Sequence, residues 1–355
     1  MNANIINIAS FPMPNEDTYY FKLYYDALAK YGYNILNTRG KKFDANWLKE
    51  NKGKIQILHF HWPAYIYSNR NALVFYKNLK SFISNIRLAK STGYKVAWTV
   101  HNIFPHERWN MLLEYLGRLA LAWLSDVIFV HFGRAKKLLF FYFGRIRKVY
   151  LIPHGNFQTV FENNCTKEDA RARLGIPANA FVYLLFGSIR HYKGVEDAMQ
   201  AFKQMNAQDT VLLIAGSPSD KELSAWITEE AKADPRVITF LKFINKEDVQ
   251  FYLNATDVVL LPYKNVFTSG NLFLALTFRK PLVAPDIGII SEVVDKNCGC
   301  KYAPDKKNIG LLEAMRNIRE IDFAQTVNSA YEKTLFFDWE KSAEISNKAF
   351  KQILR

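Results

Sequence analysis

The chain of 355 residues is 49% hydrophobic and 23% charged, which is enough for two hydrophobic cores of ordinary domain size. Its three cysteines, Cys165, Cys298 and Cys300, have no metal-ligand spacing and fit a reducing compartment. No secretory leader is visible, and the charges within residues 111–130, the longest apolar stretch, argue against a membrane-spanning helix. We therefore expect a cytoplasmic protein with two globular domains.

The excess positive charge is confined to the first part of the chain. Residues 1–157 contain 22 Lys and Arg against 8 Asp and Glu, whereas residues 158–355 contain 25 of each. Residues 51–99 contain eight cations and no acid, and aromatic and aliphatic residues lie between those cations. This pattern suits an anionic membrane surface or a diphosphate-linked lipid. Nucleic acid is the competing partner, but the chain has no recognised nucleic-acid motif, so we expect none.

Apolar strands alternate with helices along the whole chain. In the first part, the predicted strands are 5–9, 34–36, 55–61, 95–101, 127–131 and 149–153, with helices at 18–31, 72–92 and 108–125. In the second part, the predicted strands are 181–186, 211–215, 237–240, 257–263 and 281–284, with helices at 221–233, 245–254 and 308–318. Such alternation is typical of parallel sheets covered on both faces. We predict an α/β protein of two doubly wound Rossmann-like domains, 1–157 and 158–337, with a C-terminal helix, 338–355, that packs back on the first.

Five histidines follow predicted strands of the first domain: His59, His61, His101, His131 and His154. Open parallel sheets hold their ligands at this rim, so the cluster favours a binding site. A packed structural role remains the alternative for each, above all for His131 and for His59, which we expect to point to the opposite side of its strand from His61. No carboxylate or thiolate accompanies the His59-x-His61 pair, so we expect no metal.

Two polar turns in the second domain follow buried strands. The stretch FGSIRHYKG at 186–194 places Arg190 and Lys193 between a strand and a helix, where cations and helix amides together suit a diphosphate. The stretch TSGN at 268–271 opens the later helix, with Ser269 as its N-cap and Gly270 allowing an anion to approach the backbone. Each turn alone also fits an ordinary loop with exposed cations.

These turns belong to a longer series of short motifs. They are HFHWP at 59–63, TVHN at 99–102, PHE at 105–107, IPHG at 152–155, GSIRHYKG at 187–194, LLPY at 260–263, TSGN at 268–271, RKPLVA at 279–284 and SEVV at 291–294. In this order the chain resembles GT-B fold nucleotide-sugar glycosyltransferases, especially bacterial exopolysaccharide enzymes close to family 4. The resemblance implies two domains that face each other across a cleft, with the nucleotide sugar on the second domain, the acceptor on the first, and no further cofactor.

The resemblance also implies roles for individual residues. His101 would lie near the transferred sugar. Apart from the resemblance, the base that an inverting transfer needs could be Glu107, Asp17, Glu16 or His101. Asp17 and Glu16 fit the start of a helix equally well, which is a structural role. The donor-binding candidates are Ser188, Arg190, Lys193, Tyr263, Ser269, Gly270 and Asn271. The acceptor-binding candidates are Glu16, His61, Trp62, His106 and His154.

The chain departs from the family pattern at three positions. Ser188 stands where an arginine is usual, so Arg190 would replace it, and Val266 and Leu274 stand where family 4 carries two glutamates. Retention and inversion of the anomeric centre both remain open. We expect hexose transfer from GDP-mannose or a UDP-hexose to a saccharide or lipid-linked saccharide, by a protein held peripherally at the inner face of the cell membrane. The alternatives are an epimerase of the same fold and a non-catalytic nucleotide-sugar-binding subunit.

Overall fold

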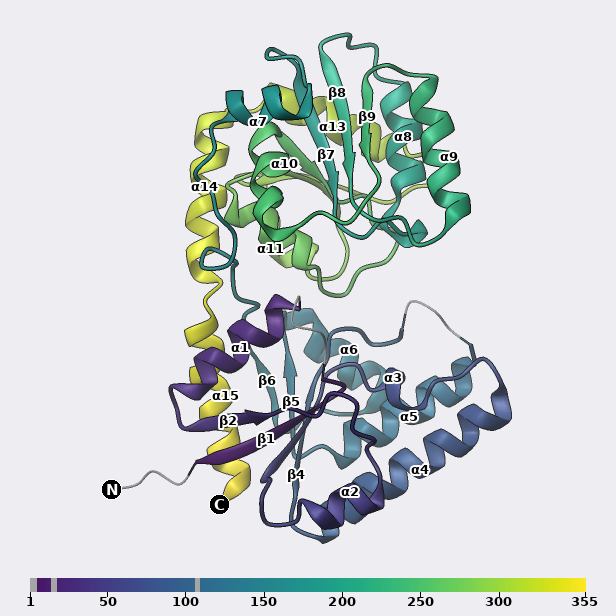
Figure 1. The fold of residues 1–355 in the computed structure, drawn as a ribbon, viewed down its shortest axis with the longest axis vertical. Coiled ribbons are helices and arrows are strands. Elements are labelled where there is room, and N and C mark those ends of the chain that lie inside the picture. Colours follow the sequence, from purple (N-terminus) through teal and green to yellow (C-terminus); the bar gives the residue numbers. More distant parts are fainter. Residues whose placement is uncertain (1–4, 14–17, 106–108) are drawn as a thin grey trace. The chain divides into compact units, whose positions relative to one another are not determined.

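The computed structural model describes residues 5–13, 18–105 and 109–355. The chain divides into two compact units, one formed by residues 1–155 with 337–355 and the other by residues 156–336. Each unit contains one parallel sheet of six strands with helices on its faces (Figure 1). The predicted α/β class is therefore confirmed.

The sheet of the first unit has the strand order β2-β1-β3-β4-β5-β6. Ile8 of β1 pairs with Ile35 of β2 on one side and with Ile57 of β3 on the other. Strand order thus reverses at β1, and the carboxyl ends of neighbouring strands meet at one edge. The strands are β1 (Ile6–Phe11), β2 (Tyr33–Leu36), β3 (Ile57–Phe60), β4 (Lys95–Thr99), β5 (Val127–Val130) and β6 (Val149–Leu151).

Helices cover both faces of this sheet. Right-handed crossovers that run in opposite directions from the reversal place their helices on opposite faces. One face carries α1 (Tyr19–Ala29) and the C-terminal helix α15 (Trp339–Leu354), which pack against each other. The Tyr24 hydroxyl of α1 donates a hydrogen bond to Ser346 Oγ of α15 at 2.9 Å. The other elements of the unit are α2 (Ala45–Glu50), α3 (Ala64–Tyr67), α4 (Ala72–Ser91), α5 (Met111–Leu124) and α6 (Gly133–Phe143).

The sheet of the second unit has the order β12-β11-β10-β7-β8-β9. Here the reversal falls between β7 and β10, where Tyr183 pairs with Val258 and Leu184 with Val259. The sequence did not predict β12, an edge strand of four residues. The strands are β7 (Phe181–Phe186), β8 (Thr210–Ala215), β9 (Val237–Phe240), β10 (Val258–Leu260), β11 (Leu282–Pro285) and β12 (Gly299–Tyr302).

The core of the second unit lies between its sheet and three of its helices. Buried side chains such as Met199, Phe202, Ile227 and Met315 pack against Tyr183 and its neighbours in the sheet. This packing fixes β7 and β10 side by side, so the loops that leave their carboxyl ends are neighbours. The helices are α7 (Lys167–Leu174), α8 (Val195–Lys203), α9 (Lys221–Lys232), α10 (Val249–Ala255), α11 (Gly270–Thr277), α12 (Ile290–Val293), α13 (Ile309–Asn317) and α14 (Phe323–Phe336).

Candidate functional site

The loop after β7 makes a tight polar turn before α8. Gly187 and Gly194 both have positive φ angles, +88° and +73°, a backbone region that favours glycine. A Cβ atom at Gly194 would lie 1.9 Å from the carbonyl oxygen of Pro262, so this turn packs directly on the chain that leaves β10. The Lys264 amide also donates to the Tyr192 carbonyl oxygen at 2.8 Å. The two predicted loops therefore form one structure at the reversal of the sheet.

The second loop is tied to the same point by side chains. Ser269 caps α11 by accepting a hydrogen bond from the Leu272 amide at 3.3 Å, and its hydroxyl lies 3.0 Å from the Tyr263 hydroxyl. Asn271 in the first turn of α11 donates through Nδ2 to the Phe186 carbonyl oxygen at 2.6 Å. These bonds hold the amino terminus of α11 beside the carboxyl end of β7. Backbone amides at a helix amino terminus favour anions.

Lys193 is the cation that these loops enclose. Burial and, to a smaller extent, the positive charge of Arg190 together lower the pKa of its amine to about 8. Arg190 itself is exposed, and its Nε donates to Ser188 Oγ at 3.2 Å. Among the described residues, no acidic side chain stabilises the charge of this partly desolvated lysine, which lies beside a second cation. An entering phosphate would supply an anion.

The structure brings several of the predicted donor residues together. Ser188, Lys193, Tyr263 and Asn271 line one small pocket of about 20 Å³ at the carboxyl ends of β7 and β10. Open α/β sheets bind ligands at such a reversal of strand order. Arg190, Ser269 and Gly270 lie next to these residues in sequence but do not line the pocket. The binding roles of all seven remain predictions.

The two positions where family 4 carries glutamates hold packed apolar side chains. Val266 is 7% exposed and Leu274 is 6% exposed. The Val266 carbonyl oxygen lies 2.1 Å from where a Cβ atom of Gly288 would stand, so this backbone has no room to move toward Gly288. A donor sugar would therefore have to be recognised without carboxylates at these positions.

The histidines of the first unit gather at the carboxyl edge of its sheet. His59, His61, His101, His131 and His154 are all at most 8% exposed. The prediction that His59 and His61 point to opposite sides of the strand is wrong, since their ring centroids lie 4.1 Å apart. Residues two apart in a strand share a face, because side chains alternate with a period of two. Trp62 stacks on His101 with ring centroids 4.4 Å apart.

Four hydrogen bonds join three of these histidines into a buried chain. His59 Nε2 lies 2.8 Å from Thr99 Oγ1, and His59 Nδ1 lies 2.9 Å from the Tyr25 hydroxyl. The same hydroxyl lies 3.0 Å from His61 Nε2, and His61 Nδ1 lies 2.9 Å from His101 Nε2. His59 thus has partners for both ring nitrogens, which fits the structural role considered for it.

Burial keeps these histidines neutral near pH 7. It lowers the pKa of His59 to about 3, of His131 to about 4 and of His154 to about 3. Burial also lowers the pKa values of His61 and His101, and repulsion from neighbouring histidines lowers them further. Among the described residues, no group of three or more His, Cys, Asp or Glu side chains is placed to hold a metal ion.

The remaining predicted site residues divide into two groups. His61, Trp62, His101 and His154 lie in the cluster, where Tyr20 contacts the rings of His61, His101 and His154. Glu16, Asp17, His106 and Glu107 lie outside the described residues.

The sequence did not identify Tyr25, which links His59 to His61, or Thr99, which bonds to His59. It also did not identify Trp339, whose ring centroid lies 5.2 Å from that of His154. Tyr25 sits on the apolar face of α1, where a hydroxyl cannot be told from ordinary aromatic packing. Trp339 lies about 185 positions away in the chain and approaches because α15 returns to this unit.

Comparison with known proteins gives the family. A model described as glycosyl transferases group 1 matches residues 166–350, more than half of the chain. The chain belongs to the group 1 glycosyltransferases. This match covers both loops of the second unit, and the predicted resemblance is confirmed.

Relatives and solved structures agree with this assignment. A GDP-mannose:glycolipid 4-beta-D-mannosyltransferase of Xanthomonas campestris pv. campestris is 25% identical over 236 residues, which cover 65% of this chain and 62% of that protein. The chain thus spans about three fifths of this curated relative. The putative teichuronic acid biosynthesis glycosyltransferase TuaC of Bacillus subtilis is 24% identical over 135 residues, 38% of this chain and 32% of that protein.

Two solved structures have the same fold. Sucrose-phosphate synthase from Thermosynechococcus elongatus has a TM-score of 0.74 at 17% identity, over 98% of this chain and 99% of its own. HepE from Anabaena, in complex with UDP and glucose, has a TM-score of 0.74 at 14% identity, over 98% of this chain and 100% of its own. The predicted GT-B class is confirmed by these neighbours.

Proposed function

We propose that this group 1 glycosyltransferase moves a hexose from a nucleotide-diphosphate sugar to a saccharide or lipid-linked saccharide acceptor. The observation that carries the proposal is the position of Lys193, a partly buried cation where the strand order of the sheet reverses. It lies beside Arg190 and the amino terminus of α11. These groups suit the diphosphate of a donor, because they supply charge and amide hydrogens at one point.

The leaving diphosphate gains negative charge as the glycosidic bond breaks. Lys193 and Arg190 stabilise that charge, and backbone amides in the first turn of α11 donate hydrogen bonds to it. The protein thereby supplies from its own side chains the charge compensation that some transferases obtain from a metal. We therefore propose a metal-independent transfer.

The donor is GDP-mannose or a UDP-hexose. GDP-mannose is named for the Xanthomonas relative and UDP for the HepE complex. Val266 and Leu274 give an apolar surface where hydroxyl recognition by carboxylates would otherwise occur. We propose that the amide of Asn271 and the hydroxyl of Tyr263 contribute polar contacts instead.

The first unit supplies the acceptor side of the reaction. His101, held by Trp62 and His61, presents a neutral imidazole at the carboxyl edge of the sheet, where it can accept a proton from an acceptor hydroxyl or donate to an oxygen. The Xanthomonas relative is named as an enzyme that acts on a glycolipid. We propose a lipid-linked acceptor and peripheral attachment at the inner face of the cell membrane, in a pathway of exopolysaccharide or glycoconjugate synthesis.

A thermal-shift screen with GDP, UDP and ADP tests the donor class. The correct nucleotide should raise the melting temperature, because a ligand that binds only the folded state stabilises it by mass action. Turnover of the matching nucleotide sugar is then followed with and without EDTA, in the presence and absence of a lipid-linked acceptor. Release of a changed sugar from donor alone would instead indicate an epimerase. Binding without turnover across acceptors would indicate a non-catalytic subunit.

A further inference from the structure

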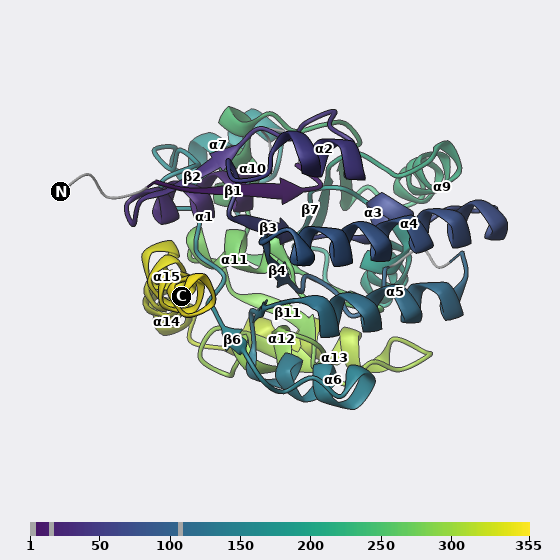
Figure 2. The ribbon, with the colours of Figure 1, turned by 90° about the horizontal axis from the view of Figure 1, so that it is seen from below.

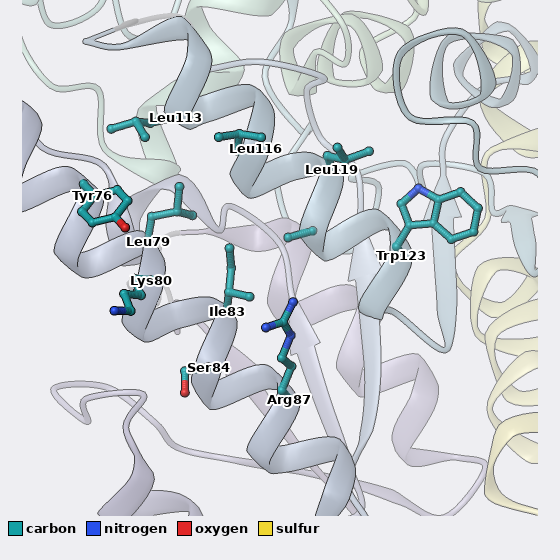
Figure 3. Close-up of a pocket in the computed structure, with 11 residues that line it drawn as sticks. Tyr76, Leu79, Lys80, Ile83, Ser84, Arg87, Leu113, Leu116, Leu119 and Trp123 are labelled. Carbon is teal, nitrogen blue, oxygen red and sulfur yellow. The ribbon is translucent and has the colours of Figure 1, made fainter.

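A groove of about 660 Å³ runs between α4 and α5 in the first unit, and no histidine is among its described lining residues (Figure 3). Its floor is apolar. Figure 3 shows Leu79 and Ile83 of α4 pointing toward α5, whose Leu113, Leu116 and Leu119 form the opposite wall. The volume is in the range of cavities that hold small organic ligands.

The charged groups at this groove are of one sign. Lys80 and Arg87 line it, and none of its described lining residues is acidic. Helix α4 contains no acid, and the one acid of α5, Glu114, is fully buried and accepts a hydrogen bond from the Ser68 hydroxyl. An occupant that complements this surface is both apolar and anionic.

Exposed aromatic side chains stand at the groove. Tyr76 is 55% exposed and Trp123 is 58% exposed, although both line the groove. The Trp123 indole is held in place, because its Nε1 donates to the Phe143 carbonyl oxygen at 2.9 Å. Tyrosine and tryptophan are the residues that gather where a protein meets the headgroup region of a bilayer.

Helix α6, which neighbours α5, also has exposed apolar side chains in a segment rich in cations. Figure 2 shows α4, α5 and α6 in succession on one side of the sheet, and α5 packs against both of the others. Phe140 and Phe141 of α6 and Ile146 beyond it are more than half exposed. Residues 127–161 contain six cations and no acid. Exposed apolar residues among cations are typical of surfaces that bind anionic membranes.

We propose that the α4–α5 groove binds an anionic membrane surface, with lipid phosphates on Lys80 and Arg87 and an acyl chain against the leucines. The inference rests on the proposed function, because a lipid-linked acceptor is held in such a membrane. It adds the surface by which the protein reaches that acceptor. No described helix has the length and apolarity to cross a bilayer.

Flotation of the whole chain with vesicles tests the proposal. Phosphatidylglycerol vesicles should carry the protein at low salt and release it at high salt, while phosphatidylcholine vesicles should carry little. The double variant Lys80→Gln/Arg87→Gln should weaken binding to the anionic vesicles by roughly twentyfold, since each cation near such a surface contributes about fivefold. Leu116→Asn, at a side chain that is 40% exposed, should also weaken it.

Two matched controls are available in the second unit. Lys221→Gln/Lys242→Gln removes the same net charge at exposed lysines, and Phe243→Asn removes an aromatic side chain that is 68% exposed. Both should float like the unaltered protein. If the controls lose binding as strongly as the groove variants, or if no variant changes it, the groove is not the site. Failure of the unaltered protein to float, together with self-association that Leu116→Asn abolishes, would identify a surface for a second copy and overturn the proposal.

Donor binding is measured on the same variants by thermal shift with the selected nucleotide. The groove variants should keep the full shift, because they lie in the other unit from Lys193. Normal flotation without any nucleotide shift would contradict the proposed function and leave the groove assignment standing. A normal nucleotide shift without flotation would contradict the groove assignment alone.

Discussion

The Nδ1 atom of His61 lies 2.9 Å from the Nε2 atom of His101, and this contact couples the tautomers of the two rings. Each neutral histidine has one ring proton, and the Tyr25 hydroxyl also has one. The chain from Thr99 through His59, Tyr25 and His61 to His101 needs one proton in each of its four bonds. All donors must therefore point the same way, toward Thr99 or toward His101.

Tyr25→Phe interrupts this chain at its centre. His101 then loses the coupling that selects its tautomer, and two histidine nitrogens lose their partner. We expect kcat to fall roughly tenfold or more, on the scale that small misplacements of reacting groups cost. The stability should fall by about 1–3 kcal/mol, the cost of leaving buried polar groups unsatisfied. Steady-state kinetics and denaturant unfolding measure the two effects.

Tyr24→Phe is the matched control. Tyr24 is on the same helix and is also buried, but its hydroxyl bonds to Ser346 and to none of the histidines. It should lose a similar amount of stability while keeping kcat. Equal loss of kcat in the two variants would show that the histidine chain has no special role.

Donor affinity should depend on pH through Lys193. Its pKa is lowered to about 8 by burial and by Arg190, so the amine is charged below pH 8 and loses its proton above it. A bound diphosphate favours the charged form and raises the pKa again. Affinity for the nucleotide should therefore be constant well below pH 8 and fall above it, by at most tenfold per pH unit. Isothermal titration between pH 6.5 and 9.5 measures this.

Lys193→Arg separates the charge from the titration. An arginine stays charged over the whole range, so the fall above pH 8 should disappear even if the affinity at pH 7 changes. If the affinity of this variant for the nucleotide still falls above pH 8, the titrating group is not Lys193.

The sequence predicted the alternation of strands and helices well because both sheets are parallel and buried on both faces. The run at 181–186 and the turn after it are where they were expected, and the helix expected at 338–355 starts at Trp339 with Asp338 as its cap. Strand β12 was missed because GCKY is short and lies at an edge. The sequence does not reveal that the buried face of α15 includes Ser346 and Asn347, because their partners Tyr24 and Tyr33 are more than 300 positions away.

The site was predictable where local sequence determines it. Ser269 as a cap and Lys193 before a left-handed glycine follow from spacing alone. The contact of Gly194 with Pro262 and the bond from Asn271 to Phe186 join segments about 70 and 85 residues apart, so only the folded chain shows them. For the region of the α4–α5 groove, the sequence showed only that basic residues alternate with apolar ones, and it did not predict the groove.

Gly194→Ala tests the close approach of the two loops. Its Cβ would stand 1.9 Å from the Pro262 carbonyl oxygen, and its φ is positive as well. We expect a loss of roughly 3 kcal/mol or more and a loss of nucleotide binding, because steric overlap adds to backbone strain. Gly175→Ala, where φ is also positive but nothing lies within 4 Å, should cost only about 1 kcal/mol and keep nucleotide binding. A similar effect of both variants would show that the overlap at Gly194 is relieved at little cost.

The histidine cluster should make the first unit sensitive to acid. In the folded state its five pKa values lie below that of an unfolded histidine, near 6.5, so only the unfolded state takes up protons as the pH falls below 6.5. The free energy of unfolding is therefore at its full value above pH 6.5 and falls as the pH drops below 6.5. Between pH 7.5 and 5.5 it should fall by roughly 1.4 kcal/mol for each histidine. Denaturant unfolding at both pH values measures it, and His131→Asn should reduce the difference by one such step. Equal stability at the two pH values would contradict the assignment of neutral, buried histidines.

The most direct test is isothermal titration of GDP and UDP into the unaltered protein and into Arg190→Gln/Lys193→Gln at pH 7. We expect that one nucleotide binds and that the double variant weakens its binding by roughly a hundredfold or more, since each charged hydrogen bond contributes about 1.5–3 kcal/mol. Lys221→Gln/Lys242→Gln, with the same change in net charge, should bind as the unaltered protein does. An unchanged dissociation constant in the Arg190 and Lys193 variant would contradict the donor site described for the second unit.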